Sequence, residues 1–121
     1  MRYLCLVYFK PEALAALSPS EKATLDRDSM AYDRELSRSD HYVVAEALEP
    51  VRSARTVRVR RGKASAIDGP FAETKEHLGG FILIEAADMN EALEIAAGIP
   101  LAELGSIEVR PVMQTSNQPR Q

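Results

Sequence analysis

The chain has 121 residues, of which 45% are hydrophobic and 27% are charged, and it carries a net charge of −3 at pH 7. A chain of this length forms one domain around one core, and its composition is typical of globular proteins. The acidic balance argues against nucleic acid or an anionic membrane surface as the main partner, and no segment has membrane-spanning length.

The first residues predict a strand. Residues 2–9 (RYLCLVYF) are β-prone and apolar on both faces, and Pro11 ends the run. This apolar opening is too short for a secretion signal, so we expect a cytoplasmic protein. Cys5, the single cysteine, is expected to be a small buried residue rather than a reactive thiol.

A short helical turn at residues 12–17 is followed by a long helix. Ser18 supplies an N-cap, Pro19 occupies the first helical position, and Glu21 completes a capping box. The helix is predicted to end near Ser39. Its apolar residues are expected to be buried: Ala23, Leu25, Met30, Tyr32 and Leu36.

Strands are predicted at residues 41–48, 55–60, 64–67, 80–86 and 107–113, with a second helix from Asp88 to Gly98. The order β-α-β-β-α-β with an extra hairpin is the ferredoxin-like split βαβ pattern. We therefore predict an α+β fold with an antiparallel sheet and both helices on one face. Residues 1–113 form the domain, and residues 114–121 are expected to be a flexible tail.

Two helices can cover only one face of this sheet, yet its strands are apolar on both faces. In the first strand Tyr3, Cys5 and Val7 alternate with Leu4 and Leu6. An open apolar sheet face is larger than monomers usually tolerate. We therefore expect a homodimer in which two sheets pack face to face.

Residues 55–63 contain five cations. Arg58 and Arg60 alternate with Val57 and Val59, which is typical of a strand with one buried and one solvated face. This pattern favours a half-exposed strand over a nucleic-acid-binding surface.

The segment Asp68–Glu76 (DGPFAETKE) combines a turn with several ionisable groups. Asp-Gly-Pro favours a tight turn, and Phe71 is expected to anchor that turn in a hydrophobic place on the body. Side chains on an anchored loop are well placed to bind a ligand, so Glu73 is a candidate substrate-binding residue. A solvated connection is the alternative.

The DGPFAETKE run resembles the signature of the YciI-like family, in its DGPF-domain branch. Other segments agree with the family in order and spacing over residues 1–113: the first strand from Met1 to Leu6, Glu46-Ala47-Leu48, Thr56-Val57-Arg58, Gly79-Gly80-Phe81 and Glu108-Val109-Arg110-Pro111. The resemblance implies a ferredoxin-like dimeric α+β barrel. It does not imply one reaction, because most DGPF-type proteins have no established activity.

The sequence contains no clustered ligands with metal-site spacing, no phosphate-binding glycine loop and no nucleophile motif, so we predict neither a metal nor a cofactor. An acid/base site remains possible. His41 begins a strand and Asp68 begins the signature turn, and a carboxylate that orients an imidazole can support proton transfer on a small substrate. Tyr8, at a strand end, is a further candidate for contacting a ligand. Each of these residues also has a purely structural or solvated alternative.

Two functional hypotheses follow. The YciI-like resemblance implies a His/Asp pair in a dimer cleft, and some relatives act on chlorinated or muconate-type compounds, so the first hypothesis is an enzyme or binder of small organic acids. DGPF-type domains also occur beside extracytoplasmic-function sigma factors. The second hypothesis is therefore a non-catalytic regulatory module linked to such a factor.

Overall fold

The computed structural model describes residues 1–114 and contains a four-stranded antiparallel sheet with strand order β2-β5-β1-β6. This order and the βαββαβ sequence of elements fit the ferredoxin-like topology, which confirms the predicted α+β class. The strands of this sheet are β1 (Arg2–Phe9), β2 (Tyr42–Ala47), β5 (His77–Glu85) and β6 (Gly105–Pro111).

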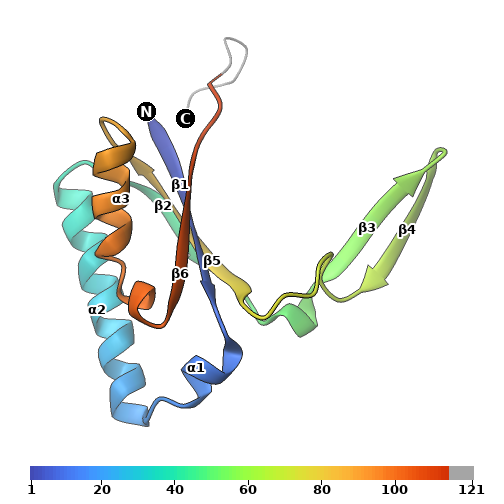
Figure 1. Cartoon of the computed structure of the whole chain (residues 1–121), viewed down its shortest axis with the longest axis horizontal. Helices are drawn as coiled ribbons and strands as arrows, with labels where there is room; N and C mark the ends of the chain where they lie inside the picture. Colours follow the sequence, from blue (N-terminus) through green and yellow to red (C-terminus); the bar gives the residue numbers. More distant parts are fainter. Residues whose placement is uncertain (115–121) are drawn as a thin grey trace.

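Two main helices pack against the same face of the sheet, as predicted (Figure 1). In α2 (Pro19–Arg38), the Ser18 side chain accepts from the Glu21 N–H while the Glu21 carboxylate accepts from the Ser18 N–H, which forms the expected capping box. In α3 (Met89–Ala97), the Asp88 carboxylate accepts from the Glu91 N–H, and the Glu91 carboxylate accepts from the Ala87 N–H. The short elements are α1 (Pro11–Ala15), η1 (Val51–Ser53) and η2 (Pro100–Glu103).

The core lies between the helices and the sheet. Tyr3, Cys5 and Val7 of β1 alternate into it, and Ile82 and Ile84 of β5 pack beside them. Burial raises the pKa of the Cys5 thiol to about 11, so this cysteine is a buried apolar residue and not a reactive thiolate, as expected.

The opposite face of the sheet is open within one chain. Leu4, Leu6 and Tyr8 of β1 point to this open face, since they alternate with the buried residues of the same strand. Their neighbours in register are Phe81 and Leu83 of β5. The open sheet face therefore carries the uncovered apolar stripe from which the homodimer was predicted.

Strands β3 (Arg55–Arg60) and β4 (Lys63–Asp68) form a separate two-stranded sheet, hereafter the arm. Figure 1 shows the arm projecting from the body on the side opposite to the helices. At its root the Gly69 N–H donates to the Ala54 carbonyl at 2.7 Å, and the Thr56 hydroxyl donates to the Gly69 carbonyl at 2.9 Å. Gly69 has φ +102°, a conformation that glycine adopts without steric strain.

Three burial predictions are wrong. Phe71 is 73% exposed and stacks under the Arg58 guanidinium at 5.0 Å instead of anchoring in the body. Val57 is 65% exposed, so the arm strand is open on both faces and not half-buried, because no other layer of residues 1–114 lies beside it. Ala23 and Met30 are exposed because that part of α2 faces solvent.

No helix in residues 1–114 is both long enough and apolar enough to cross a bilayer. The predicted flexible tail falls almost entirely on residues 115–121, outside the described part of the chain.

Candidate functional site

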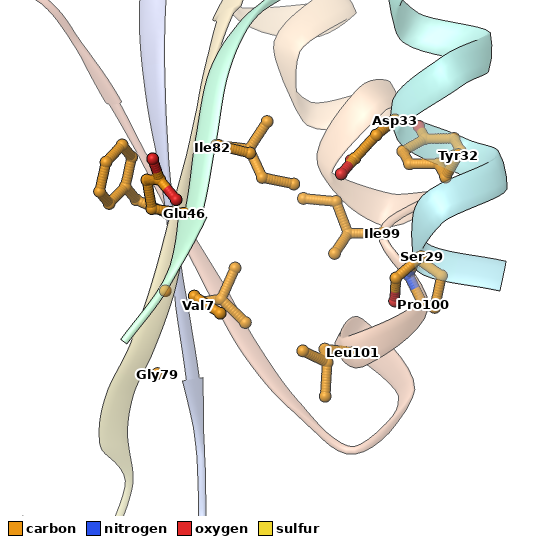
Figure 2. Close-up of a pocket in the computed structure, with 14 residues that line it drawn as sticks. Val7, Ser29, Tyr32, Asp33, Glu46, Gly79, Ile82, Ile99, Pro100 and Leu101 are labelled. Carbon is orange, nitrogen blue, oxygen red and sulfur yellow. The ribbon is translucent and has the colours of Figure 1, made fainter. Parts of the chain in front are cut away.

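A cavity of about 190 Å³ lies between α2, the sheet and η2 (Figure 2). The sheet contributes Val7 and Ile82, and the segment around η2 contributes Ile99 and Leu101. These walls are apolar. An apolar cavity of about 150 Å³ can hold benzene, so this cavity has room for a six-membered ring with small substituents.

Helix α2 supplies the polar groups of the cavity from Ser29, Tyr32 and Asp33. Positions separated by three and four residues share one side of a helix, and the buried Leu36 continues this side towards the core. The same side of the helix therefore presents a hydroxyl, a phenol and a carboxylate to the cavity and the Leu36 side chain to the core.

Tyr32 is fixed in place by its hydroxyl, which donates to the Ile95 carbonyl of α3 at 2.6 Å. Gly98, directly after α3, permits this contact, since a Cβ at that position would lie 2.4 Å from the Tyr32 oxygen. Tyr32 therefore links α2 to α3 by a hydrogen bond and also forms part of the cavity wall.

Asp33 is the carboxylate that α2 contributes to the cavity. Within residues 1–114 its carboxylate makes neither a hydrogen bond nor an ion pair, and burial raises its pKa above the usual range of an aspartate. Burial disfavours the charged form of a carboxyl group that has no compensating partner. A carboxyl group with a raised pKa in an apolar cavity is suited to giving or taking a proton.

Glu46 also borders the cavity, yet its carboxylate lies on the far side of the sheet from α2 in Figure 2. In register it pairs with Phe81, a residue of the open sheet face. Asp33 is therefore the only carboxylate directed at the cavity among those that line it.

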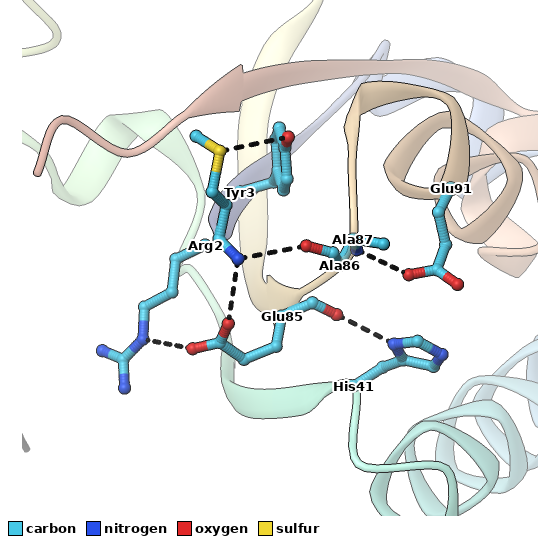
Figure 3. A network of polar contacts seen from close by, with 8 residues as sticks. Arg2, Tyr3, His41, Glu85, Ala86, Ala87 and Glu91 are labelled. Atoms are coloured by element: carbon cyan, nitrogen blue, oxygen red, sulfur yellow. Dashed lines mark hydrogen bonds and ion pairs between the residues drawn. The ribbon is translucent and has the colours of Figure 1, made fainter.

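His41 lies at the end of the sheet where β2 begins and β5 ends. Its Nδ1 is 2.8 Å from the Glu85 carbonyl, and its own carbonyl accepts from the Glu85 N–H (Figure 3). Because a carbonyl only accepts, Nδ1 carries a proton and Nε2 is the ring nitrogen left to exchange one.

Asp68 ends β4, and its carboxylate faces Arg55 at 3.1 Å across the root of the arm. The arm follows the opposite end of the sheet from His41, since Leu48 and Gly79 are hydrogen-bonded where β2 ends and β5 begins. The length of β5, from His77 to Glu85, is roughly 27 Å. One chain therefore does not bring His41 and Asp68 together.

The two predicted ligand-contacting residues are also apart from the Asp33 cavity. Tyr8 lies on the open sheet face between Leu78 and Ser106. Glu73 is exposed in the loop between β4 and β5. Neither lines the Asp33 cavity.

A second cavity, of about 360 Å³, lies at the root of the arm. Its walls include Phe9, Leu14 and Leu48, and its ionisable residues are Glu49, Arg52 and His77. His77 follows the signature segment directly. Among residues 1–114, no group of histidine, cysteine and carboxylate side chains has a metal-binding arrangement.

Residues 1–116 match the family model of the YCII-related domain. The chain belongs to this family. A relative, an uncharacterized protein of Rhizobium meliloti (strain 1021), is 38% identical over 114 residues that cover 93% of this chain and 92% of the relative. The finer assignment of this YCII-related protein to the DGPF branch stays a prediction that rests on the DGPFAETKE run.

A solved structure with the same fold is 5-chloro-2-hydroxyhydroquinone dehydrochlorinase from Burkholderia phenoliruptrix AC1100, in complex with 2,5-dihydroxybenzoquinone. The match has a TM-score of 0.57 and covers 98% of this YCII-related chain and 100% of the dehydrochlorinase. The sequences are 16% identical, so the likeness concerns the fold alone.

Proposed function

We propose that this YCII-related protein binds a small ring compound in the cavity under α2 and transfers a proton to or from it through Asp33. The observation that carries the proposal is a carboxyl group with a raised pKa and no hydrogen-bond or ion-pair partner within residues 1–114, in an apolar cavity with room for a six-membered ring. An apolar pocket with few polar groups, one of them a titratable residue with a shifted pKa, is the usual form of a small-molecule site.

The chemistry follows from the surroundings of Asp33. Apolar walls hold a ring by burying its surface, and the Ser29 hydroxyl supplies a hydrogen-bonding group one turn from the carboxyl. Removal of a proton from a ring hydroxyl and return of a proton to the adjacent ring carbon convert a phenol into its keto tautomer, and the reverse transfers restore the phenol. The fold neighbour holds a compound of this class, a dihydroxybenzoquinone, which supports hydroxylated rings as the first ligands to test.

The predicted acid/base pair of His41 and Asp68 enters this proposal only between two copies, in a cleft of the expected homodimer. It would then be a second proton-transfer site beside Asp33. The alternative of a regulatory module linked to a sigma factor stays a prediction, and no observation on the chain favours it.

The binding test uses 2,5-dihydroxybenzoquinone and 1,2,4-trihydroxybenzene as probes. Their addition to isotope-labelled protein is expected to shift the amide signals of Val7, Ile82 and Ile99. Ala45→Leu places a larger side chain in the cavity wall and is expected to abolish these shifts. Binding that is unaffected by Ala45→Leu would place the ligand elsewhere and contradict the proposal.

The proton-transfer test follows the exchange of ring C–H protons of the bound trihydroxybenzene for deuterium. Asp33→Asn keeps the shape but removes the proton carrier, so exchange is expected to slow by roughly a hundredfold while binding persists. Asp26→Asn, an exposed carboxylate two turns earlier in the same helix that does not line the cavity, is the matched control and is expected to exchange at the wild-type rate. Equal rates in all three proteins would leave a binding site without acid/base chemistry.

A further inference from the structure

The arm has two faces of different chemistry. Its apolar face is formed by two register pairs, in which Val57 lies opposite Ala66 and Val59 lies opposite Ala64, and the Arg55–Asp68 ion pair ends this face at the root. Its cationic face carries Arg58, Arg60 and Lys63 on the alternate positions, with Ile67 near the root. Such an amphipathic pattern indicates a hairpin whose apolar face packs against another surface while its cationic face contacts solvent.

No such surface exists within the described chain. Val57 and Val59 are 65% and 56% exposed, although they are the largest apolar residues of that face. A two-stranded hairpin alone in water is marginally stable at best, since it has no layer against which to bury side chains. Within the described chain the arm therefore lacks the packing contact that its apolar face predicts.

The position of the arm indicates what provides that contact. It projects on the side of the sheet opposite to the helices, which is the side of the open sheet face (Figure 1). A second copy packed on the open sheet face would thus stand directly beside the arm. The uncovered stripe around Leu6 and Leu83 therefore lies on the side of the sheet to which the arm projects.

The areas agree with this arrangement. At about 3.4 Å per residue and about 4.8 Å per strand, one face of the arm measures roughly 200 Å² and the open sheet face roughly 450 Å². Two packed sheets would bury roughly 900 Å², and two arms with the surfaces beneath them roughly 800 Å². A specific interface buries about 1,200–2,000 Å², which neither contact reaches alone and both reach together.

The charges agree as well. Residues 55–63 carry five cations and no carboxylate, so the remaining chain has a net charge of −8 against −3 for the whole. A cationic arm held away from its own acidic body is attracted to the acidic body of another copy.

We propose that the apolar face of the arm docks on the body of a second copy of this chain, so that the two arms of a homodimer clasp the opposite protomers. Sheet packing and arm docking then form one continuous interface. This proposal is independent of the function proposed for the Asp33 cavity.

The first experiment measures the dimer dissociation constant by sedimentation velocity over a concentration series. The double substitution Val57→Glu and Val59→Glu places two carboxylates in the proposed contact and is expected to weaken dimerisation by roughly a hundredfold or more. Ser65→Glu adds the same type of charge on the cationic face of the same hairpin and is expected to change the constant by less than about threefold. Equal constants for the double variant and the wild type would overturn the proposal.

The second experiment does not depend on how the arm tolerates charge. A nitroxide label is placed at Val59→Cys in unlabelled protein, which is then mixed with isotope-labelled wild type; the buried Cys5 does not compete for the label. Docking is expected to broaden amide signals of the body, within residues 1–47 or 77–111, in the labelled wild-type chain. The control label at Met30→Cys, on the helix side, is expected to broaden none.

Absence of broadening from the Val59 label in a mixed dimer would show that the arm lies free, and would overturn the proposal. A wild-type chain that stays monomeric at high micromolar concentration would also overturn it, and would leave the apolar face of the arm for a different protein. Normal circular dichroism of each variant serves as the folding control.

Discussion

The Nε of Arg55 lies 3.1 Å from the Asp68 carboxylate, so the first residue of β3 and the last residue of β4 are joined by an ion pair. The Asp68 side chain is 90% exposed and that of Arg55 is 67% exposed. This contact gives the signature aspartate a local role at the arm root, and an ion pair in this setting contributes little to stability because water screens it.

We therefore expect Asp68→Asn to lower the melting temperature by at most about 4 °C. If Asp68 also acts with His41 across two copies, the same change would reduce turnover of a bound substrate by roughly a hundredfold at that nearly constant melting temperature. His41→Gln would then behave in the same way, and the double variant would be no worse than the worse single variant. Unchanged turnover in both variants would show that Asp68 and His41 have structural roles only.

The raised pKa of Asp33 predicts that this residue lowers the free energy of unfolding as pH rises. Its pKa in the folded state is raised by burial, so its ionisation opposes folding at neutral pH, and this penalty disappears as pH falls through the raised pKa towards the unfolded value of about 3.9. Asp33→Asn is expected to be more stable than wild type at pH 7 and equal to it below about pH 4. Urea denaturation across this range measures the difference, and a gap that does not change with pH would contradict the raised pKa.

Glu85 has the opposite effect on the free energy of unfolding as pH rises. The hydrogen bond from Arg2 Nε, at 3.0 Å, holds the pKa of the Glu85 carboxyl below its usual range (Figure 3). Its ionisation therefore favours folding above the unfolded pKa of about 4.3, and this contribution is lost as pH falls through the lowered value. Glu85→Gln is expected to be slightly less stable than wild type at pH 7 and equal to it at the lowest pH, with a smaller difference in high salt.

The close approach of Gly98 to Tyr32 predicts a coupled pair. Gly98→Ala would force a Cβ to within 2.4 Å of the Tyr32 oxygen and disturb the bond to the Ile95 carbonyl, at an expected cost of about 1–3 kcal/mol. Tyr32→Phe removes that oxygen, so the double variant is expected to lose less than the sum of the two single losses. Chemical denaturation of the four proteins measures this coupling, and strict additivity would show that the contact is not made.

The body of the fold could be predicted because local signals agree there with the tertiary structure. Residues 2–9 were predicted to be a strand that is apolar on both faces, and the Ser18 and Asp88 caps marked the starts of both helices. The arm could be predicted as a hairpin but not as an exposed one. Alternation of Arg58 with Val57 and Val59 indicates which residues share a face, whereas burial depends on a neighbouring layer that one chain does not supply.

The Asp33 cavity was missed because Asp33 lies in a helix rich in charged residues, where a single carboxylate is normally solvated. The available signal was its spacing from Leu36 and Tyr32, which puts a carboxylate on the side of α2 that faces the core. The closeness of η2 to this helix depends on tertiary packing and left no local pattern. The His41–Asp68 pair rested on two strand ends meeting, and the arm separates those ends within one chain.

The chain enters and leaves the arm region at a single point of the body, where the Leu48 N–H donates to the Gly79 carbonyl at 2.8 Å. Because the chain between Leu48 and Gly79 begins and ends at neighbouring residues, it can be shortened, lengthened or replaced. The order of the strands around Cys5 and Ile82 does not change. Changes in the arm can therefore alter the proposed docking contact while the residues of the Asp33 cavity stay unchanged. A hairpin transplanted from another protein of this architecture would replace that contact and leave the cavity in place.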